Sequence, residues 1–433
     1  MSKPMVVDLV FEGGGMKGIA LVGALRALAE QNYQPGRLLG SSIGSMVATL
    51  LAAGYSAQEL LGLIVDPTTG ELVLKNHIKP FSAFTPVQIE ASATLSFLKD
   101  VNLPVLPDFL EGGVDGWLAK SLMGNTFLQG FFMFLEKAGT HDPEPFVRWL
   151  ESLLGEKLAA QTETLMGDLT LAQLHQITGH HLSLLAANVT NPTMLILNHN
   201  TAPDCPVVQA VRMATAAPGF FPPAAWQTEW GAYRSREMTG ELIMNGGVIS
   251  NFPIELFLSQ DEMVTSILGK PDDNAGVLGL LLDESLAVPG APQTPPNTLQ
   301  QSLSELPGIS LLTQLIRTTI EARDKRAMEL APELVVRLPV GGYAPFVFNL
   351  TPDQLQPLVN ASHNAMLLHL EKYQPSARSL NQIVQLQVDK AAKHIINVYG
   401  NMITVNQDIG EVKESGTVVG VKIGAGEQVN QIN

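Results

Sequence analysis

The chain has 433 residues, of which 45% are hydrophobic and 15% charged, so it can supply one large domain with an appendage or two to three average domains. Its formal net charge is −15, and the acidic side chains are spread along the chain, which argues against nucleic acid as a partner and against strong constitutive binding to anionic membranes. The single cysteine, Cys205, cannot form an internal disulfide, as fits a reducing compartment. We find no signal-peptide pattern and no transmembrane-length apolar run, and therefore expect a cytoplasmic protein.

Strand-like and helix-like segments alternate at the start of the chain. Residues 5–11, MVVDLVF, form a β-branched run that ends at a cluster of glycines, which is typical of a buried strand entering a tight loop. Leu21, Leu25 and Leu28 then recur at helical spacing, and a second helix is expected over residues 45–53. This order predicts an α/β fold.

The middle of the chain continues this pattern. Further strands are predicted at residues 181–189, 193–198, 276–283 and 334–340, and helical stretches around residues 297–331 and 352–373. Residues 117–135 gather several Phe residues and one Trp. Their simpler interpretation is a core helix that covers the sheet, and the alternative is a lid or lipid-facing wall beside a site for acyl chains.

The composition changes near the end of the chain. Residues 376–433 contain one aromatic residue, Tyr399, and their last part alternates β-branched with small or polar residues. Such a segment cannot build much of a core by itself. We expect a domain at residues 1–375 and a tail at residues 376–433 that is either β-prone and used for assembly or disordered.

The segment Gly40-Ser41-Ser42-Ile43-Gly44 fits the G-x-S-x-G motif of a nucleophile elbow. In that motif the serine lies on a sharp turn between a strand and a helix, and the flanking glycines let the backbone pass closely. An apolar run precedes the segment and an apolar helix is expected to follow it. By itself the motif leaves open a simpler interpretation, a small-residue loop that joins two elements.

A second glycine-rich segment follows the first predicted strand and consists of Gly13, Gly14, Gly15, Met16, Lys17 and Gly18. Successive N–H groups at a helix N-terminus bind negative charge, such as the oxyanion of an acyl-transfer intermediate. The same glycines also spell G-x-G-x-x-G, the fingerprint of a Rossmann-type nucleotide site. That fingerprint expects an acidic residue about 20 positions further on, at the end of the second strand. Here the second strand leads into the Ser42 elbow instead, and we favour the hydrolase interpretation.

A nucleophilic serine needs a base. None of the nine histidines stands in an evident catalytic setting, so we expect ordinary surface or core-edge residues, with adjacent His180 and His181 pointing apart if extended. The other class of base is a carboxylate that contacts the serine directly.

The order of strand, GGGMKG, helix and GSSIG resembles the patatin-like phospholipases, a family of lipid acyl hydrolases with a Ser/Asp dyad and no catalytic histidine. The blocks AVRMATAAPGFFPP at residues 210–223 and NGGVISNFPI at residues 245–254 extend the resemblance, which covers roughly residues 5–373. It implies a three-layer α/β/α fold around a mostly parallel sheet, Ser42 as the nucleophile, and the N–H groups of residues 13–18 as the oxyanion hole. It also implies acyl esters of membrane lipids as substrates, a transient encounter with a membrane surface, and neither a metal nor an organic cofactor.

The sequence departs from the family where the dyad aspartate is expected, because Asn245 stands there. An amide is nearly isosteric with a carboxylate but is no useful general base. Either an inactivating substitution has been made in an otherwise active enzyme, or the protein is a naturally inactive lipid-binding or scaffolding relative. The retained serine, elbow and glycine segment favour the first interpretation.

The tail carries a second resemblance. Residues 410–424, GEVKESGTVVGVKIG, are similar to short Gly/Val signalling motifs at the ends of some bacterial immune-type effectors. This similarity implies amyloid-like stacking that joins copies of the chain or a signalling partner through residues 400–430. It further implies a cytoplasmic enzyme that is concentrated at membranes on demand.

Overall fold

The computed structural model of the chain describes residues 5–66, 68–100, 126–291, 331–348, 350–373, 382–400, 418–419 and 431–432. Residues 297–330 of the predicted helical stretch lie outside these ranges. So does the first part of the aromatic stretch, residues 117–125.

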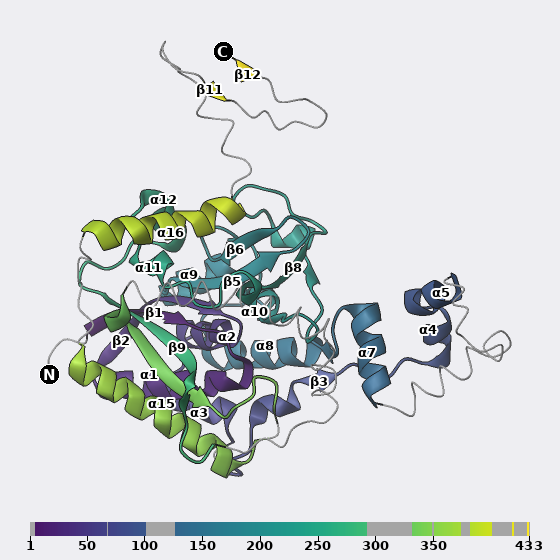
Figure 1. The fold of residues 1–433 in the computed structure, drawn as a ribbon, viewed down its shortest axis with the longest axis horizontal. Helices are drawn as coiled ribbons and strands as arrows, with labels where there is room; N and C mark the ends of the chain where they lie inside the picture. Colours follow the sequence, from purple (N-terminus) through teal and green to yellow (C-terminus); the bar gives the residue numbers. More distant parts are fainter. Residues whose placement is uncertain are drawn as a thin grey trace.

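An eight-stranded sheet organises the described part of the chain, with the order β10-β9-β1-β2-β5-β8-β7 and β6 paired to β5 (Figure 1). The strands from β10 to β5 run parallel, and β6, β7 and β8 pair antiparallel. The sheet is therefore mixed and mostly parallel, as expected. Its strands are β1 (Met5–Phe11), β2 (Tyr33–Ser41), β5 (Leu182–Asn188), β6 (Thr193–Leu197), β7 (Ala224–Ala225), β8 (Leu242–Asn245), β9 (Gly276–Ala287) and β10 (Val335–Gly341).

Both faces of the sheet are buried. Successive side chains of a strand point to opposite faces, and here the two sets belong to two different apolar clusters. In β1, Leu9 and Phe11 belong to one apolar cluster and Val10 to a second one. In β2, Leu38 and Leu39 are divided in the same way. A strand that is buried on both faces has a continuous apolar sequence, and for this reason these strands could be recognised in the sequence.

Helices on the two faces complete three layers (Figure 1). The larger cluster is covered by α1 (Ile19–Glu30), α2 (Ile43–Ala52), α3 (Ala57–Ile64), α8 (Glu144–Leu158), α9 (Leu171–Thr178), α10 (Val207–Thr215) and α15 (Pro352–Lys372). The smaller cluster is covered by α11 (Glu255–Leu258), α12 (Glu262–Leu268) and α16 (Gln382–Gly400). The chain thus has the three-layer α/β/α architecture that was predicted.

Several smaller elements lie outside these layers. Three helices, α4, α5 and α7, lie to one side of the sheet in Figure 1. Two pairs of two-residue strands are antiparallel, β3 with β4 and β11 with β12. The elements are α4 (Pro86–Glu90), α5 (Ala93–Asp100), α7 (Thr126–Lys137), β3 (Lys79–Pro80), β4 (His141–Asp142), β11 (Val418–Val419) and β12 (Gln431–Ile432).

The sequence predicts a β-prone or disordered tail from residue 376. This prediction is wrong for residues 382–400, which form helix α16. Val388, Ala392 and Ile395 lie on one stripe of this helix and are fully buried in the smaller cluster. The Lys393 ammonium also pairs with the Asp261 carboxylate at 2.6 Å. The helix is therefore part of the third layer.

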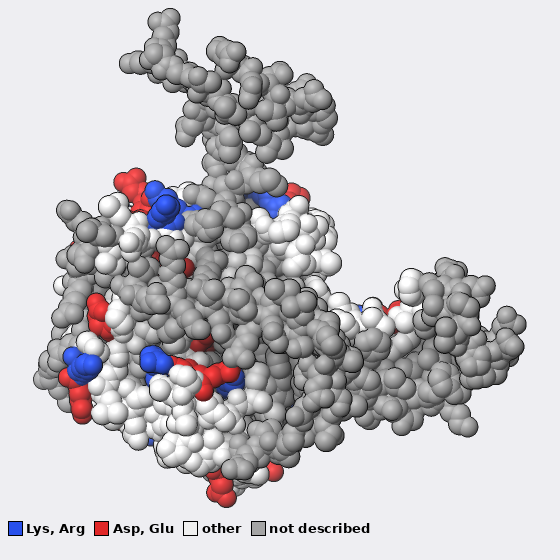
Figure 2. Space-filling model, viewed as in Figure 1, with Lys and Arg blue, Asp and Glu red and all other residues white. Residues whose placement is uncertain are grey.

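Surface charge and helix length both bear on contact with membranes. On the face shown in Figure 2, the described basic and acidic side chains are interspersed, and no patch of one sign dominates. In the described ranges, we find no helix with both the length and the apolar character needed to cross a membrane.

Candidate active site

Ser42 lies between the end of β2 and the start of α2, at the edge of the sheet where the parallel strands end. Its backbone has φ 51° and ψ −125°, a conformation that L-residues rarely adopt. Holding a non-glycine residue there costs on the order of 1–3 kcal/mol and is typical of functional sites. This is the sharp strand-to-helix turn that the elbow interpretation predicts.

Close packing explains the glycines on both sides of Ser42. A Cβ on Gly40 would lie 2.5 Å from the Gly44 carbonyl oxygen, and a Cβ on Gly44 would lie 2.6 Å from the Phe11 carbonyl oxygen. Neither position has room for a side chain. The elbow consequently rests directly on the end of β1.

The glycine segment runs against the elbow. A Cβ on Gly13 would lie 2.6 Å from Ser42 Cβ, so the two loops pass in contact. The chain then forms a short 3-10 helix, η1 (Gly15–Gly18), and enters α1. The glycine segment and the nucleophile candidate are thus brought together.

Backbone hydrogen bonds reduce the number of N–H groups that could form the predicted oxyanion hole. The Met16 N–H donates to the Pro345 carbonyl at 2.8 Å, and the Lys17 N–H donates to the Gly14 carbonyl at 3.2 Å. The Lys17 ammonium is buried and pairs with the Glu284 carboxylate. Met16 and Lys17 are therefore weak candidates, and the N–H groups of the three glycines at 13–15 are the better ones.

Asn245 ends β8 and is 6% exposed. Its register places it near the elbow, because Ser41 pairs with Leu185 of β5 and Asn245 pairs with the next residue, Ala186. Two strand spacings, about 10 Å, therefore separate the two backbones. The Asn245 Oδ1 accepts a hydrogen bond from the Gly247 N–H at 2.7 Å. An aspartate in this position could keep that bond with one oxygen and offer the other to the serine.

Asn251 is a site residue that sequence reasoning missed. Its Oδ1 accepts a hydrogen bond from the Ser41 hydroxyl at 3.2 Å, and its Nδ2 donates to the Gly13 carbonyl at 2.6 Å. One amide thus ties the elbow to the glycine segment. The residue lies inside the block that carries the family resemblance, but nothing in the spacing singled it out.

Glu12 is the carboxylate nearest in sequence to the glycine segment. Its Oε2 accepts from the Leu282 N–H at 2.5 Å, and its Oε1 accepts from Asn251 Nδ2 at 3.4 Å. Both oxygens are engaged by donors of the scaffold. Glu12 is therefore a structural residue in this arrangement and a poor candidate for a general base.

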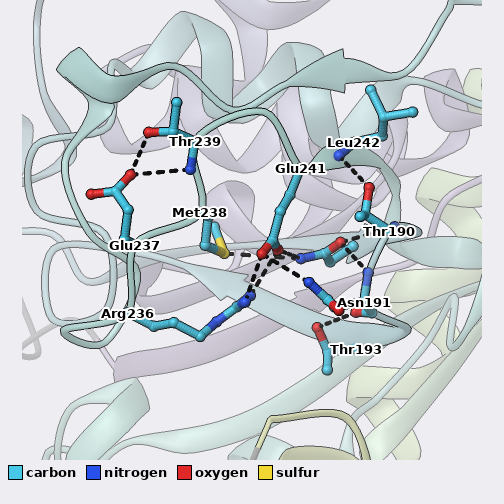
Figure 3. A network of polar contacts seen from close by, with 10 residues as sticks. Thr190, Asn191, Thr193, Arg236, Glu237, Met238, Thr239, Glu241 and Leu242 are labelled. Atoms are coloured by element: carbon cyan, nitrogen blue, oxygen red, sulfur yellow. Dashed lines mark hydrogen bonds and ion pairs between the residues drawn. The ribbon is translucent and has the colours of Figure 1, made fainter. Parts of the chain in front are cut away.

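A polar network fixes the strand that carries Asn245 (Figure 3). Glu241, next to the start of β8, accepts two hydrogen bonds from the Arg236 guanidinium at 2.8 and 3.0 Å. It also accepts from Asn188 of β5 and from Asn191. Burial tends to raise the pKa of Glu241, but these hydrogen bonds outweigh it and the pKa lies below its ordinary value.

A group of aromatic side chains lies near Pro345, which contacts Gly15 of the glycine segment, and near Gly219, which contacts Phe134. We call this group the phenylalanine rim: Phe134, Phe220, Phe346 and Phe348. Phe220 stacks on Phe346 and Phe348 with ring centroids 5.2 and 5.7 Å apart. Phe346 is 50% exposed and follows Pro345, whose carbonyl holds the glycine segment. Phe134 of α7 is 45% exposed, which puts an apolar side chain of the aromatic stretch on the surface.

A cavity of about 430 Å³ lies elsewhere, at the beginning of the parallel strands. Val7, Leu25, Tyr33, Tyr55 and His180 are among its lining residues, and Ser42 is not. Because the elbow lies where the strands end, this cavity is not part of the candidate active site.

The chain is similar to several known proteins. The chain is 29% identical over 259 residues to the uncharacterized protein YqhO of Bacillus subtilis (strain 168), which covers 58% of this chain and 67% of that protein. It is 23% identical over 248 residues to the probable lipid hydrolase 463L of Invertebrate iridescent virus 6, covering 57% and 62%. Among solved structures, VipD from Legionella pneumophila aligns with a TM-score of 0.43 and 17% identity, covering 86% of this chain and 67% of that one.

The family model described as patatin-like phospholipase matches residues 9–258, which begin within β1 and include the elbow and the block after Asn245. We therefore set the nucleotide-binding alternative aside. Since the match covers more than half of the sequence, this chain belongs to the patatin-like phospholipase family.

Proposed function

We propose that the chain is a lipid acyl hydrolase in which Ser42 is the nucleophile and position 245 is the place of its base. With asparagine there, the chain is arrested before proton transfer. The observation that carries the proposal is the strained backbone of Ser42, held against Gly13 at the start of α2. A serine with no chemical task would gain nothing from this strain.

The proposed reaction begins with attack of Ser42 Oγ on an ester carbonyl. An aspartate at position 245 would take the serine proton, and the N–H groups at residues 13–15 would stabilise the oxyanion. The positive end of the α2 dipole also favours negative charge at the serine. The tetrahedral intermediate then collapses and breaks the ester C–O bond, and the departing alcohol takes the proton that the aspartate holds. A water molecule, deprotonated by the same carboxylate, cleaves the acyl-enzyme, which releases the fatty acid and returns the proton to Ser42 Oγ.

Asn245 blocks this sequence at its first proton transfer. The amide has no lone pair basic enough to accept the serine proton, and its Oδ1 is already bound to the Gly247 N–H. The geometry of the turn is nevertheless preserved, because Asp and Asn have nearly the same shape. We infer that one substitution separates this chain from an active enzyme.

The phenylalanine rim supports a lipid as the substrate. Exposed Phe346 follows Pro345, which contacts the candidate oxyanion donor Gly15, and exposed Phe134 lies against Gly219, next to Phe220 of the same rim. These apolar side chains offer a contact surface for an acyl chain or a membrane. The membership in a family of patatin-like phospholipases points to membrane phospholipids. The net charge of −15 makes the encounter transient, since it opposes constitutive binding to anionic lipid.

A naturally inactive lipid-binding or scaffolding protein is the second candidate. The observation that favours it is the satisfied Asn245 side chain, which is buried and hydrogen-bonded in its turn. Such a protein would bind phospholipid vesicles without hydrolysing them, and changing residue 245 would not create turnover.

The test compares hydrolysis of a chromogenic short-chain ester and a labelled phospholipid by three forms: the chain as it stands, Asn245→Asp, and Asn245→Asp with Ser42→Ala. We expect background rates from the first, a rise of roughly 10²–10⁴-fold from the second, and background again from the third. As a matched control, Asn360→Asp makes the same chemical change at an exposed position of helix α15 and should leave the rate unchanged. A folded Asn245→Asp form that cleaves neither substrate contradicts the proposal and favours the binding protein.

A further inference from the structure

Three histidines from separate segments meet at the end of the sheet away from the elbow. His175 belongs to α9, His181 directly precedes β5, and His199 follows β6. One ligand nitrogen from each ring lies within 4.8 Å of the other two. We propose that these three residues, the histidine cluster, bind one divalent transition-metal ion of the zinc class.

The chemistry of the donors selects this class of ion. Neutral imidazole nitrogens suit zinc, cobalt, nickel and copper, whereas magnesium and calcium require oxygen ligands. Three protein ligands leave one position of a tetrahedral ion for water. The cluster is half-buried, so solvent can reach that position.

A hydrogen bond fixes the tautomer of at least one of the three histidines so that a ring nitrogen is free to bind a metal ion. The Nδ1 of His175 lies 2.9 Å from the His180 carbonyl oxygen, so this nitrogen carries the proton and Nε2 keeps its lone pair. A carbonyl partner of this kind orients the metal-binding histidines of known sites. The Nδ1 of His181 is buried without a hydrogen-bond partner, which is unusual for a polar atom in a folded protein.

The ring positions define what must move when an ion binds. The rings of His175 and His199 are stacked with centroids 3.8 Å apart, and His181 lies 4.7 and 5.0 Å from them. Three nitrogens on one zinc ion lie about 3.4 Å apart, given bonds of about 2.0–2.1 Å. The ligand nitrogens now lie within 4.8 Å of one another, so binding requires the stacked rings to rotate until their lone pairs converge and the nitrogen–nitrogen distances shorten by up to about 1.4 Å.

The nearest fixed positive charge does not prevent binding. Arg37 lies close to His181, but its guanidinium is paired with the buried Asp8 carboxylate at 2.7 Å and donates to the Gly269 carbonyl at 2.8 Å. The charge is thus neutralised within the scaffold. Because the cluster joins α9 to both ends of the β5–β6 hairpin, a bound ion would stabilise this corner of the fold and take no part in ester cleavage.

The test uses the full chain without an affinity tag, stripped with a chelator and titrated with Co²⁺ and then with Zn²⁺. We expect visible absorption bands of tetrahedral Co²⁺ that saturate at one ion per chain, their loss when Zn²⁺ is added, and a higher melting temperature with either ion. His199→Gln and His175→Gln should each weaken Co²⁺ binding at least about tenfold.

His363→Gln is the matched control, because His363 lies on α15 outside the cluster and pairs with Glu30. It should bind Co²⁺ like the unchanged chain. Two results would overturn the proposal: no saturable Co²⁺ spectrum in the folded chain, or a spectrum that His199→Gln and His175→Gln leave unaltered. Either would mean that the three rings only pack against one another.

Discussion

Asn251 shows how one side chain can position a reactive group without touching the substrate. It holds Ser41 through its Oδ1 and Gly13 through its Nδ2, and these residues adjoin the nucleophile and the candidate oxyanion donors. In the Asn245→Asp background, we expect Asn251→Ala to lower kcat roughly 10²-fold, the cost of misplacing reacting groups by about 1 Å. The KM for a short-chain ester should change little, because the bound substrate does not meet this residue.

Asn251→Asp refines this prediction. The carboxylate can still accept from the Ser41 hydroxyl but cannot donate to the Gly13 carbonyl or to the Glu12 carboxylate, so this variant keeps the bond to the elbow and removes both bonds made by Nδ2. A loss of kcat in both variants, with unchanged melting temperatures, supports a positioning role. If both instead lose only stability and retain full turnover once folded, Asn251 is merely structural.

Residues whose type is fixed by steric demands could be predicted from the sequence, and residues fixed by distant partners could not. Gly40 and Gly44 admit no side chain, so their spacing around Ser42 carries the signal. Asn251 bonds to a residue 210 positions away, and asparagine is common in loops for many other reasons.

At the scale of single elements, β8 depends on the network around Glu241. Replacing Glu241 by Gln removes the charge that Arg236 pairs with and weakens the hydrogen bonds from Asn188 and Asn191. We expect the folded state to lose about 1–3 kcal/mol at neutral pH. In the Asn245→Asp background, turnover should fall as well, because this network sets the start of the strand that ends at residue 245.

The stabilising effect of Glu241 should also depend on pH. The pKa of Glu241 is lower in the folded state than its ordinary value, so its contribution to stability is present above the unfolded pKa and is lost as the pH falls through the folded pKa. The difference in melting temperature between the unchanged chain and Glu241→Gln should therefore shrink on acidification. Glu229→Gln makes the same chemical change at an exposed position outside this network and is the control. A difference that is constant from neutral to acidic pH would contradict the prediction.

Elements with one dominant apolar pattern were predictable, including the five-residue strand β6, and elements without such a pattern were not. Strands β1, β5 and β9 could be located in the sequence by their continuous apolar runs, because both faces of these strands are buried. Strand β8 has four residues, and its pairing with β5 is set by register across the sheet. Helix α16 was missed because the β-like pattern of the residues after it dominated the composition of the whole segment.

For the whole molecule, the position of α16 moves the boundary of the proposed tail. We propose that residues 401–433, beyond this helix, are the assembly segment, and that residues 1–400 are the catalytic unit. A separate tail fits the resemblance of residues 410–424 to short stacking motifs and would allow recruitment to membranes on demand.

Two truncations of the Asn245→Asp chain test this division. Ending the chain at residue 400 should leave urea stability and short-ester hydrolysis unchanged, while abolishing any assembly detected by light scattering. Ending it at residue 375 also removes Val388, Ala392 and Ile395 from the sheet face, and should lower stability by several kcal/mol at about 1–3 kcal/mol for each large buried side chain. Equal stability of the two truncated chains would show that α16 is dispensable. Assembly that survives in both would place the self-association surface within the three layers rather than in the tail.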